Sequence, residues 1–163
     1  MSRYYAGIFF ALVTISILQV IIFYPQTPAV VASHFDGLGM ANGWSSRNGF
    51  FGLYLAIIAM LVGVFHWLPS VGSNRSVLNL KVPNPEYWLA PERLEETRLF
   101  FRRQMSLIGI LHLTLAILTV QLVIQANFQQ TPQLHSGIFW ILGLYFLLLL
   151  AWLLHFYVHF RKP

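Results

Sequence analysis

Cysteine is absent from this chain of 163 residues, and charged residues make up only 9% of it. Without cysteine there can be no disulfide bond, no thiolate-bound metal and no cysteine nucleophile. Soluble domains carry about 25% charged residues, so the low charge argues against a soluble fold. The sequence also lacks the G-x-S-x-G, H-E-x-x-H and P-loop patterns and any paired set of carboxylates. We therefore expect a protein that is not an enzyme and has no cofactor.

Long apolar runs dominate the composition, which is 57% hydrophobic. Four runs without Asp, Glu, Lys or Arg are long enough to cross about 30 Å of hydrocarbon at about 1.5 Å per residue. They cover residues 5–23, 50–68, 105–124 and 137–157. The first run exceeds the ~7–15 apolar residues of a signal peptide, so we interpret it as a true span. The predicted fold is an all-α bundle of four transmembrane helices, forming one domain over residues 1–163.

The positions of the basic residues predict the membrane topology. Nine of the ten Lys and Arg precede the first span, follow the fourth or lie between the second and third. These nine are Arg3, Arg75, Lys81, Arg93, Arg98, Arg102, Arg103, Arg161 and Lys162. Only Arg47 lies in the loop of residues 24–49. Basic residues accumulate on the cytoplasmic side of membrane proteins. We therefore predict a multi-pass protein of the bacterial inner membrane, with both termini and loop 69–104 cytoplasmic and loops 24–49 and 125–136 outside.

The cytoplasmic loop is predicted to be irregular over residues 70–88 and helical from Pro91 onward. Acidic residues follow Pro91, as is typical of a helix N-terminus, and this helix is expected to continue into the third span. Arg98, Arg102 and Arg103 lie at the membrane border, where they would contact lipid phosphates or a partner, or simply form a solvated face. The net charge of +5 is interpreted as a signal of topology and lipid contact, not of nucleic-acid binding.

The first outer loop predicts a hairpin over the mouth of the bundle. Residues 30–36 alternate as in a strand, with Ala32 and His34 on one side and Val31 on the other. Gly37, Gly39 and Asn42-Gly43 supply turn positions, Asn-Gly being a strong hairpin signal. Trp44 follows where the chain returns to the membrane interface, a common position for tryptophan.

The candidate ligand-binding residues of this hairpin are His34, Asp36, Asn42 and Trp44. His34 and Asp36 could bind a ligand or, with His135 as a third ligand, a metal. The alternative is structural: Asp36 accepts hydrogen bonds from its own turn and His34 packs against the hairpin. The structural alternative is the simpler explanation for both residues.

The same loop carries a resemblance to a known family. The motifs are Tyr24-Pro25-x-x-Pro28, Ser33-His34-Phe35-Asp36, Gly39 and Asn42-Gly43-Trp44-Ser45. They resemble the signature of a bacterial membrane domain of unknown function that also forms the N-terminal part of SdpI-type immunity proteins. Residues 82–93 are similar to a second segment of standalone members. SdpI-type proteins protect a bacterium from a secreted toxin peptide and can capture a repressor at the membrane, but they have further spans after this domain.

Polar residues within the spans offer a second candidate site. Gln121 and Gln125 share a helix face at the outer end of the third span, and Gln19 lies at the outer end of the first. In a bilayer each amide needs a partner, so hydrogen bonds between helices would account for them. The functional alternative is a polar vestibule that is continuous with His34 and Asp36.

Four histidines lie toward the cytoplasmic side. His112 is expected at about the depth of His155, so the two could bind a b-type haem, or His155 and His159 could share a metal. The alternative is that His66 and the other histidines are polar caps near the helix ends. His112 is the ionisable group within the membrane that most invites a functional explanation.

The sequence favours a non-enzymatic, SdpI-like membrane protein whose outer loop binds a peptide, lipid or envelope partner. An accessory subunit of a larger membrane complex is the alternative, supported by the small size and the aromatic-rich fourth span. A metal- or haem-dependent membrane enzyme is a third reading.

Overall fold

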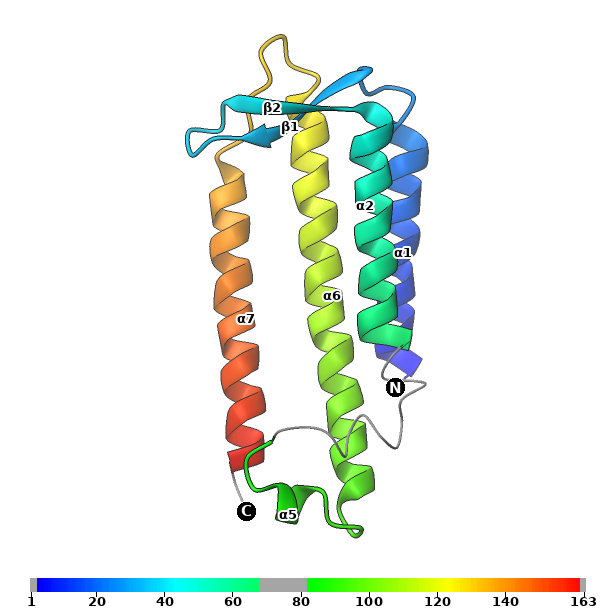
Figure 1. Cartoon of the computed structure of the whole chain (residues 1–163), viewed down its shortest axis with the longest axis vertical. Helices are drawn as coiled ribbons and strands as arrows, with labels where there is room; N and C mark the ends of the chain where they lie inside the picture. The colour runs from blue at the N-terminus through cyan, green and yellow to red at the C-terminus, as the bar shows by residue number, and fades with distance from the viewer. Residues whose placement is uncertain (1–2, 68–81, 162–163) are drawn as a thin grey trace.

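The computed structural model describes residues 3–67 and 82–161, which form four long helices and one two-stranded hairpin (Figure 1). The elements are α1 (Arg3–Phe23), β1 (Val30–Phe35), β2 (Ala41–Ser46), α2 (Arg47–Val62), the π-helical turn η1 (Gly63–Trp67), α5 (Pro85–Trp88), α6 (Leu94–Ala126) and α7 (Gly137–Arg161). Arg75, Lys81 and Lys162, which enter the predicted topology, lie outside the described residues, as does most of the segment predicted to be irregular. Residues 82–88 of that segment are described, and within them α5 forms a single helical turn.

The prediction of an all-α membrane bundle with four spans is confirmed. Each long helix is long and apolar enough to cross a bilayer, with a mean hydropathy between 2.1 and 2.5. α2 begins at Arg47, not at residue 50, because the hydroxyl of Ser46 accepts a hydrogen bond from the Gly49 amide and caps the helix. α6 has 33 residues and is about 50 Å long, so it extends beyond the hydrocarbon. The predicted cytoplasmic helix therefore does continue into the third span.

Three of the helices, α1, α2 and α6, pack as a group that we call the trio, and α7 stands on the far side of α6 (Figure 1). The core of the trio contains Phe9, Tyr54, Ile58, Leu61 and Leu113. The hairpin lies across one end of the bundle, the hairpin end. α1 begins and α7 finishes at the other end, which we call the terminal end.

A glycine on α6 allows the trio to pack closely. A Cβ atom on Gly109 would lie 2.7 Å from the Cβ of Phe65 and 3.0 Å from Cε2 of Phe9. The first distance is shorter than carbon atoms tolerate and the second is tighter than most carbon contacts, so a larger residue would require Phe65, Phe9 or α6 to shift. Small residues have this function at many helix contacts in membranes.

A buried polar group also joins the three helices of the trio. The side-chain amide of Gln19 on α1 donates to the side-chain carbonyl of Gln121 (2.8 Å) and to the backbone carbonyl of Ile117 (3.2 Å) on α6. The hydroxyl of Tyr54 on α2 donates to the carbonyl oxygen of Gln19 at 2.8 Å. The prediction that the glutamines bond between helices is confirmed for Gln19 and Gln121.

α7 is attached mainly at its two ends, since its buried residues are Ile138 and Phe160. At the terminal end, the indole N–H of Trp88 donates to the carbonyl of Phe160 at 3.0 Å. The side-chain amide of Asn84 donates to the carbonyl of Arg161 at 2.9 Å. Side chains of the α5 segment therefore satisfy carbonyls that the end of a helix leaves without partners.

The arginines of α6 are only partly free for lipid. Arg98 forms an ion pair with Glu95 at 3.4 Å, and Arg103, although exposed, lies 5.8 Å from the ring centre of Tyr5 on α1. Arg102 is half-buried. All three lie near the terminal end, where α6 leaves the predicted hydrocarbon region.

Candidate functional site

The hairpin turn is formed by residues 36–40, which include the predicted turn positions Gly37 and Gly39, but the predicted turn at Asn42-Gly43 is wrong. A carboxylate oxygen of Asp36 accepts hydrogen bonds from the amides of Leu38 and Met40, both at 2.9 Å. This confirms the structural reading of Asp36 as a residue that stabilises its own turn. Asn42 and Gly43 lie within β2 instead. Gly43 pairs with His34, and a Cβ on Gly43 would lie only 3.0 Å from the His34 Cβ, so glycine is needed there for close approach.

Ala32 is buried, as is its neighbour Val31. The pairing of the two strands is irregular directly after Ala32, between Ala32 and His34. The side chain of Asn127 satisfies the backbone at this point. Its oxygen accepts from the Ala32 amide at 2.8 Å, and its nitrogen donates to the Ala32 carbonyl at 3.0 Å. Asn127 therefore fixes β1 to the end of α6.

Two further contacts hold the hairpin on the bundle. The amide of Leu134 donates to the carbonyl of Gly39 at 2.8 Å, which joins the hairpin turn to the connection before α7. The guanidinium of Arg47 donates to the carbonyls of Thr27 (3.0 Å) and Tyr24 (3.3 Å), just after α1. The single basic residue of the predicted outer loop therefore has a structural function.

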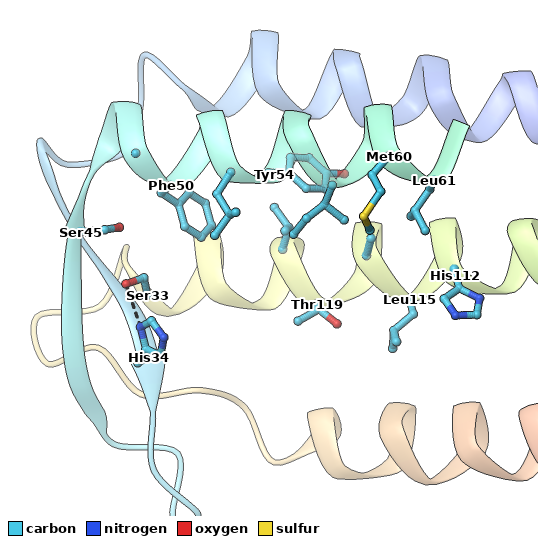
Figure 2. Close-up of a pocket in the computed structure, with 15 residues that line it drawn as sticks. Ser33, His34, Ser45, Phe50, Tyr54, Met60, Leu61, His112, Leu115 and Thr119 are labelled. Carbon is cyan, nitrogen blue, oxygen red and sulfur yellow. Dashed lines mark hydrogen bonds between the residues drawn. The ribbon is translucent and has the colours of Figure 1, made fainter. Parts of the chain in front are cut away.

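Beneath the hairpin, a cavity of about 580 Å³ runs between α2 and α6; we call it the groove (Figure 2). Its hairpin end is formed by both strands, and its walls are formed by side chains of α2 and α6. The lining residues are Ser33, His34, Ser45, Gly49, Phe50, Leu53, Tyr54, Ile57, Met60, Leu61, His112, Leu115, Ala116, Thr119 and Val120.

Polar groups of the groove gather at its hairpin end. The hydroxyl of Ser33 lies 3.3 Å from Nδ1 of His34. The hydroxyl of Ser45 is buried and has no hydrogen-bond partner among the described residues. The walls are otherwise apolar, apart from the Thr119 hydroxyl and the Tyr54 hydroxyl that bonds to Gln19.

The deep end of the groove is closed by a histidine whose two ring nitrogens both have partners. Nδ1 of His112 lies 2.8 Å from the carbonyl of Ile108, and Nε2 lies 3.1 Å from the hydroxyl of Tyr145 on α7. These two contacts supply the polar partners that an imidazole needs within the membrane. These contacts explain His112 structurally. Among the described residues that line the groove, the buried polar side-chain group without a partner is the Ser45 hydroxyl, at the hairpin end.

The other predicted site residues lie outside the groove. Asp36, Asn42 and Trp44 are exposed on the hairpin, Gln121 bonds to Gln19, and Gln125 is exposed at the hairpin end of α6. Of the predicted binding set, only His34 lines the cavity. The structure therefore does not join the glutamines and the hairpin residues into one polar vestibule.

The prediction that His112 and His155 lie at the same depth is wrong. His155 is next to Phe100 of α6, at 6.0 Å between ring centres, and Phe100 precedes His112 by about 18 Å along the helix. His159 stacks on the same Phe100 ring at 3.6 Å. Among the residues that the structure describes, no group of three or more His, Asp or Glu side chains is placed to hold a metal ion.

Two residues of this region, Ser45 and Asn127, are not among the predicted site residues. Ser45 belongs to one of the motifs given above, and Asn127 lies in the predicted outer loop of residues 125–136. Asn127 directly follows a long apolar run, where an amide is expected to satisfy backbone groups. No comparable signal marks Ser45, because its position at the groove depends on the strand pairing.

Residues 11–58 match a family model described as a domain of unknown function, DUF1648. The predicted resemblance is confirmed at this level. The match covers most of α1, the hairpin and α2 as far as Ile58, and so includes the hairpin end and one wall of the groove. No curated protein and no solved structure matches the chain.

Proposed function

We propose that this is a non-enzymatic membrane protein that binds an amphiphilic ligand in the groove beneath the hairpin. The observation that carries the proposal is the unpartnered hydroxyl of Ser45, next to Ser33 and His34, at the mouth of an otherwise apolar cavity. Ligand sites are typically concave and mostly apolar, with a few polar groups that orient the ligand. The volume of about 580 Å³ is within the usual range of about 300–1,000 Å³.

The proposal places the hairpin end outside the cytoplasm of a bacterial cell. Five of the described basic residues, Arg93, Arg98, Arg102, Arg103 and Arg161, lie toward the terminal end, and Arg47 lies at the hairpin end. This distribution supports cytoplasmic termini and contacts between the terminal end and anionic lipid. The ligand would then be a peptide, lipid or envelope component of the outer face. An immunity or signalling role of the SdpI type would fit such a ligand.

A binding role is better supported than hydrolysis by the Ser33–His34 pair. A serine nucleophile requires a histidine that is itself oriented by a third group. The nearest carboxylate in sequence, Asp36, is committed to the amides of its own turn. No acidic residue lines the groove, so these side chains are arranged to hydrogen-bond a ligand.

Photo-crosslinking in living cells tests the proposal. Benzoylphenylalanine at Leu53, on the groove wall, is expected to form an adduct of defined mass with the bound ligand. The same residue at Leu55 is the control, because Leu55 is exposed on the same helix but does not line the groove. The same products in equal yield at Leu53 and Leu55 would contradict a groove-specific ligand. The mass of the adduct distinguishes a peptide from a lipid.

A second candidate function is an accessory subunit of a larger membrane complex. The observation that favours it is the exposure of large side chains along α7, including Trp140 (83%), Phe146 (61%) and Leu147 (64%). Purification in mild detergent would yield a partner in a fixed ratio if α7 packs on another protein. In that case Trp140→Ala should release the partner, and recovery of the wild-type chain without a partner would count against this role.

A further inference from the structure

We propose that the groove holds one acyl chain of a phospholipid from the leaflet on the hairpin side, with the polar part of the lipid at Ser33, His34 and Ser45. This inference rests on the proposed function, because it names the ligand class of the same site. It depends on the length, width, polarity and lateral opening of the groove.

The length of the groove corresponds to one leaflet. Its lining residues on α2 extend from Gly49 to Leu61, which is about 18 Å along the helix. Half of a hydrocarbon core of about 30 Å is about 15 Å. A ligand that fills the groove therefore reaches from the membrane surface to about the bilayer centre. A transmembrane peptide would need twice this depth.

The width of the groove suits a single unbranched chain. A volume of about 580 Å³ over about 18 Å gives a mean cross-section of roughly 30 Å². A helix with its side chains is about 10 Å or more across, which corresponds to at least ~80 Å². The groove therefore accommodates an unbranched chain, whereas a helix could place only one face against it.

The polarity of the walls excludes an extended peptide. Every backbone amide and carbonyl placed in the hydrocarbon region needs a hydrogen-bond partner. Between the hairpin and His112, the walls offer only the hydroxyls of Tyr54 and Thr119, and the Tyr54 hydroxyl already bonds to Gln19. An acyl chain has no polar groups along this length, so it needs no hydrogen-bond partner from these walls.

The groove is open on its side toward the membrane. Leu53 and Met60 line the cavity and are 65% and 57% exposed. An acyl chain can therefore enter sideways from the bilayer, with its polar end remaining at the level of the hairpin. The ligand does not need to pass beneath the hairpin from the aqueous phase.

At the hairpin end, recognition would use hydrogen bonds without a free cation. The hydroxyls of Ser33 and Ser45 can donate to ester or phosphate oxygens, as can a ring N–H of His34. One terminal nitrogen of Arg47 donates to the carbonyls of Tyr24 and Thr27, and none of the described residues that line the groove is Lys or Arg. We therefore expect similar binding of zwitterionic and anionic phospholipids.

Native mass spectrometry of the full-length protein tests this inference. Delipidated protein is titrated with phosphatidylethanolamine or phosphatidylglycerol of the same acyl composition. The wild-type chain is expected to retain one phospholipid at activation energies that remove the others. The two headgroups should differ by less than about threefold in affinity, since the site lacks a cation to distinguish them.

Two variants and one control localise the bound lipid. Thr119→Phe fills the acyl path and should weaken retention about tenfold or more. Ser45→Val removes one hydrogen bond at the polar end and should weaken it about two- to tenfold. Leu118→Phe is the control, because Leu118 is exposed on the same helix outside the groove, and it should retain lipid as the wild type does.

Failure of this inference can be told apart from failure of the proposed function. If the wild type retains no lipid, or if Thr119→Phe retains it equally well, the acyl chain does not occupy the groove. A peptide adduct at Leu53 in cells would then overturn the lipid assignment and leave the proposed function standing. If the wild type retains no lipid and Leu53 gives no adduct beyond those formed at Leu55, both proposals fail. A preference above tenfold for the anionic headgroup would overturn recognition without a cation.

Discussion

The trio of α1, α2 and α6 and the single helix α7 are both apolar, yet they are held in different ways. The trio contains a close contact at Gly109 and buried hydrogen bonds around Gln19. α7 is buried only near its ends, and its middle is fixed by the contact between Tyr145 and His112. The described residues that line the groove belong to α2, α6 and the hairpin, and none of them is on α7. The candidate site is therefore built on the tightly packed part of the molecule, which suits a preformed binding site.

The largest effect is expected from breaking the helix contact within the trio. Gly109→Val places side-chain atoms against Phe65 and Phe9 and should destabilise the protein by about 2–3 kcal/mol, the upper range for overpacking. Gly143→Val on α7 is the matched control, because no atom lies within 4 Å of a Cβ at that position. Its effect should be within about 0.5 kcal/mol. Unfolding in mixed micelles measures both, and equal effects would remove the distinction between the trio and α7.

A smaller effect is expected where the hairpin is fixed to the trio. Asn127→Ala removes both hydrogen bonds to Ala32 and leaves buried backbone groups without partners, which should cost about 1–3 kcal/mol. Hydrogen exchange at the Ala32 amide should accelerate at the same time. Gln130→Ala, at an exposed position of the same connection, should change neither quantity. An unchanged exchange rate in Asn127→Ala would show that other contacts hold β1.

The smallest effects are expected from the two tyrosine hydroxyls. Tyr54→Phe removes a hydrogen bond within the trio, and Tyr145→Phe removes the one between α6 and α7. Each should cost about 0.6 kcal/mol, the average for hydrogen bonds between membrane helices. Only Tyr145→Phe should increase the mean distance between spin labels on α6 and α7. A similar increase from Tyr54→Phe would mean that α7 is coupled to the trio more strongly than its contacts indicate.

The spans could be predicted because their signal is local. Twenty apolar residues without charge are sufficient to indicate a membrane helix, and the continuation of α6 beyond the membrane followed from the helix start after Pro91. Gln19 and Gln121 could be predicted as partners because a bilayer offers an amide no other partner. These inferences require no knowledge of which residues meet in space.

The hairpin itself was predicted from its local signals and is confirmed. Its attachment to the bundle and the groove beneath it could not be predicted in the same way, because both depend on contacts between distant segments. The Asn-Gly pair failed as a turn signal because the bonds of Asp36 fix the turn earlier in the chain. The burial of Ala32 depends on Asn127, at a separation of 95 residues. Ser45 became a candidate only because the strand pairing brings it to the mouth of the groove.

The hydrogen bond between Trp88 and Phe160 can form only late in the synthesis of the chain. The hydroxyl of Thr97 can donate to the carbonyl of Trp88 soon after both residues are synthesised. The indole N–H of Trp88 has its acceptor only after Phe160, 72 positions later, has been added. At elongation rates of about 5–20 residues per second, this delay is about 4–14 s. During that interval the trio can already assemble, while the corner formed by α5 cannot be completed. Closure of the bundle at the terminal end can therefore begin only after Phe160 has been added.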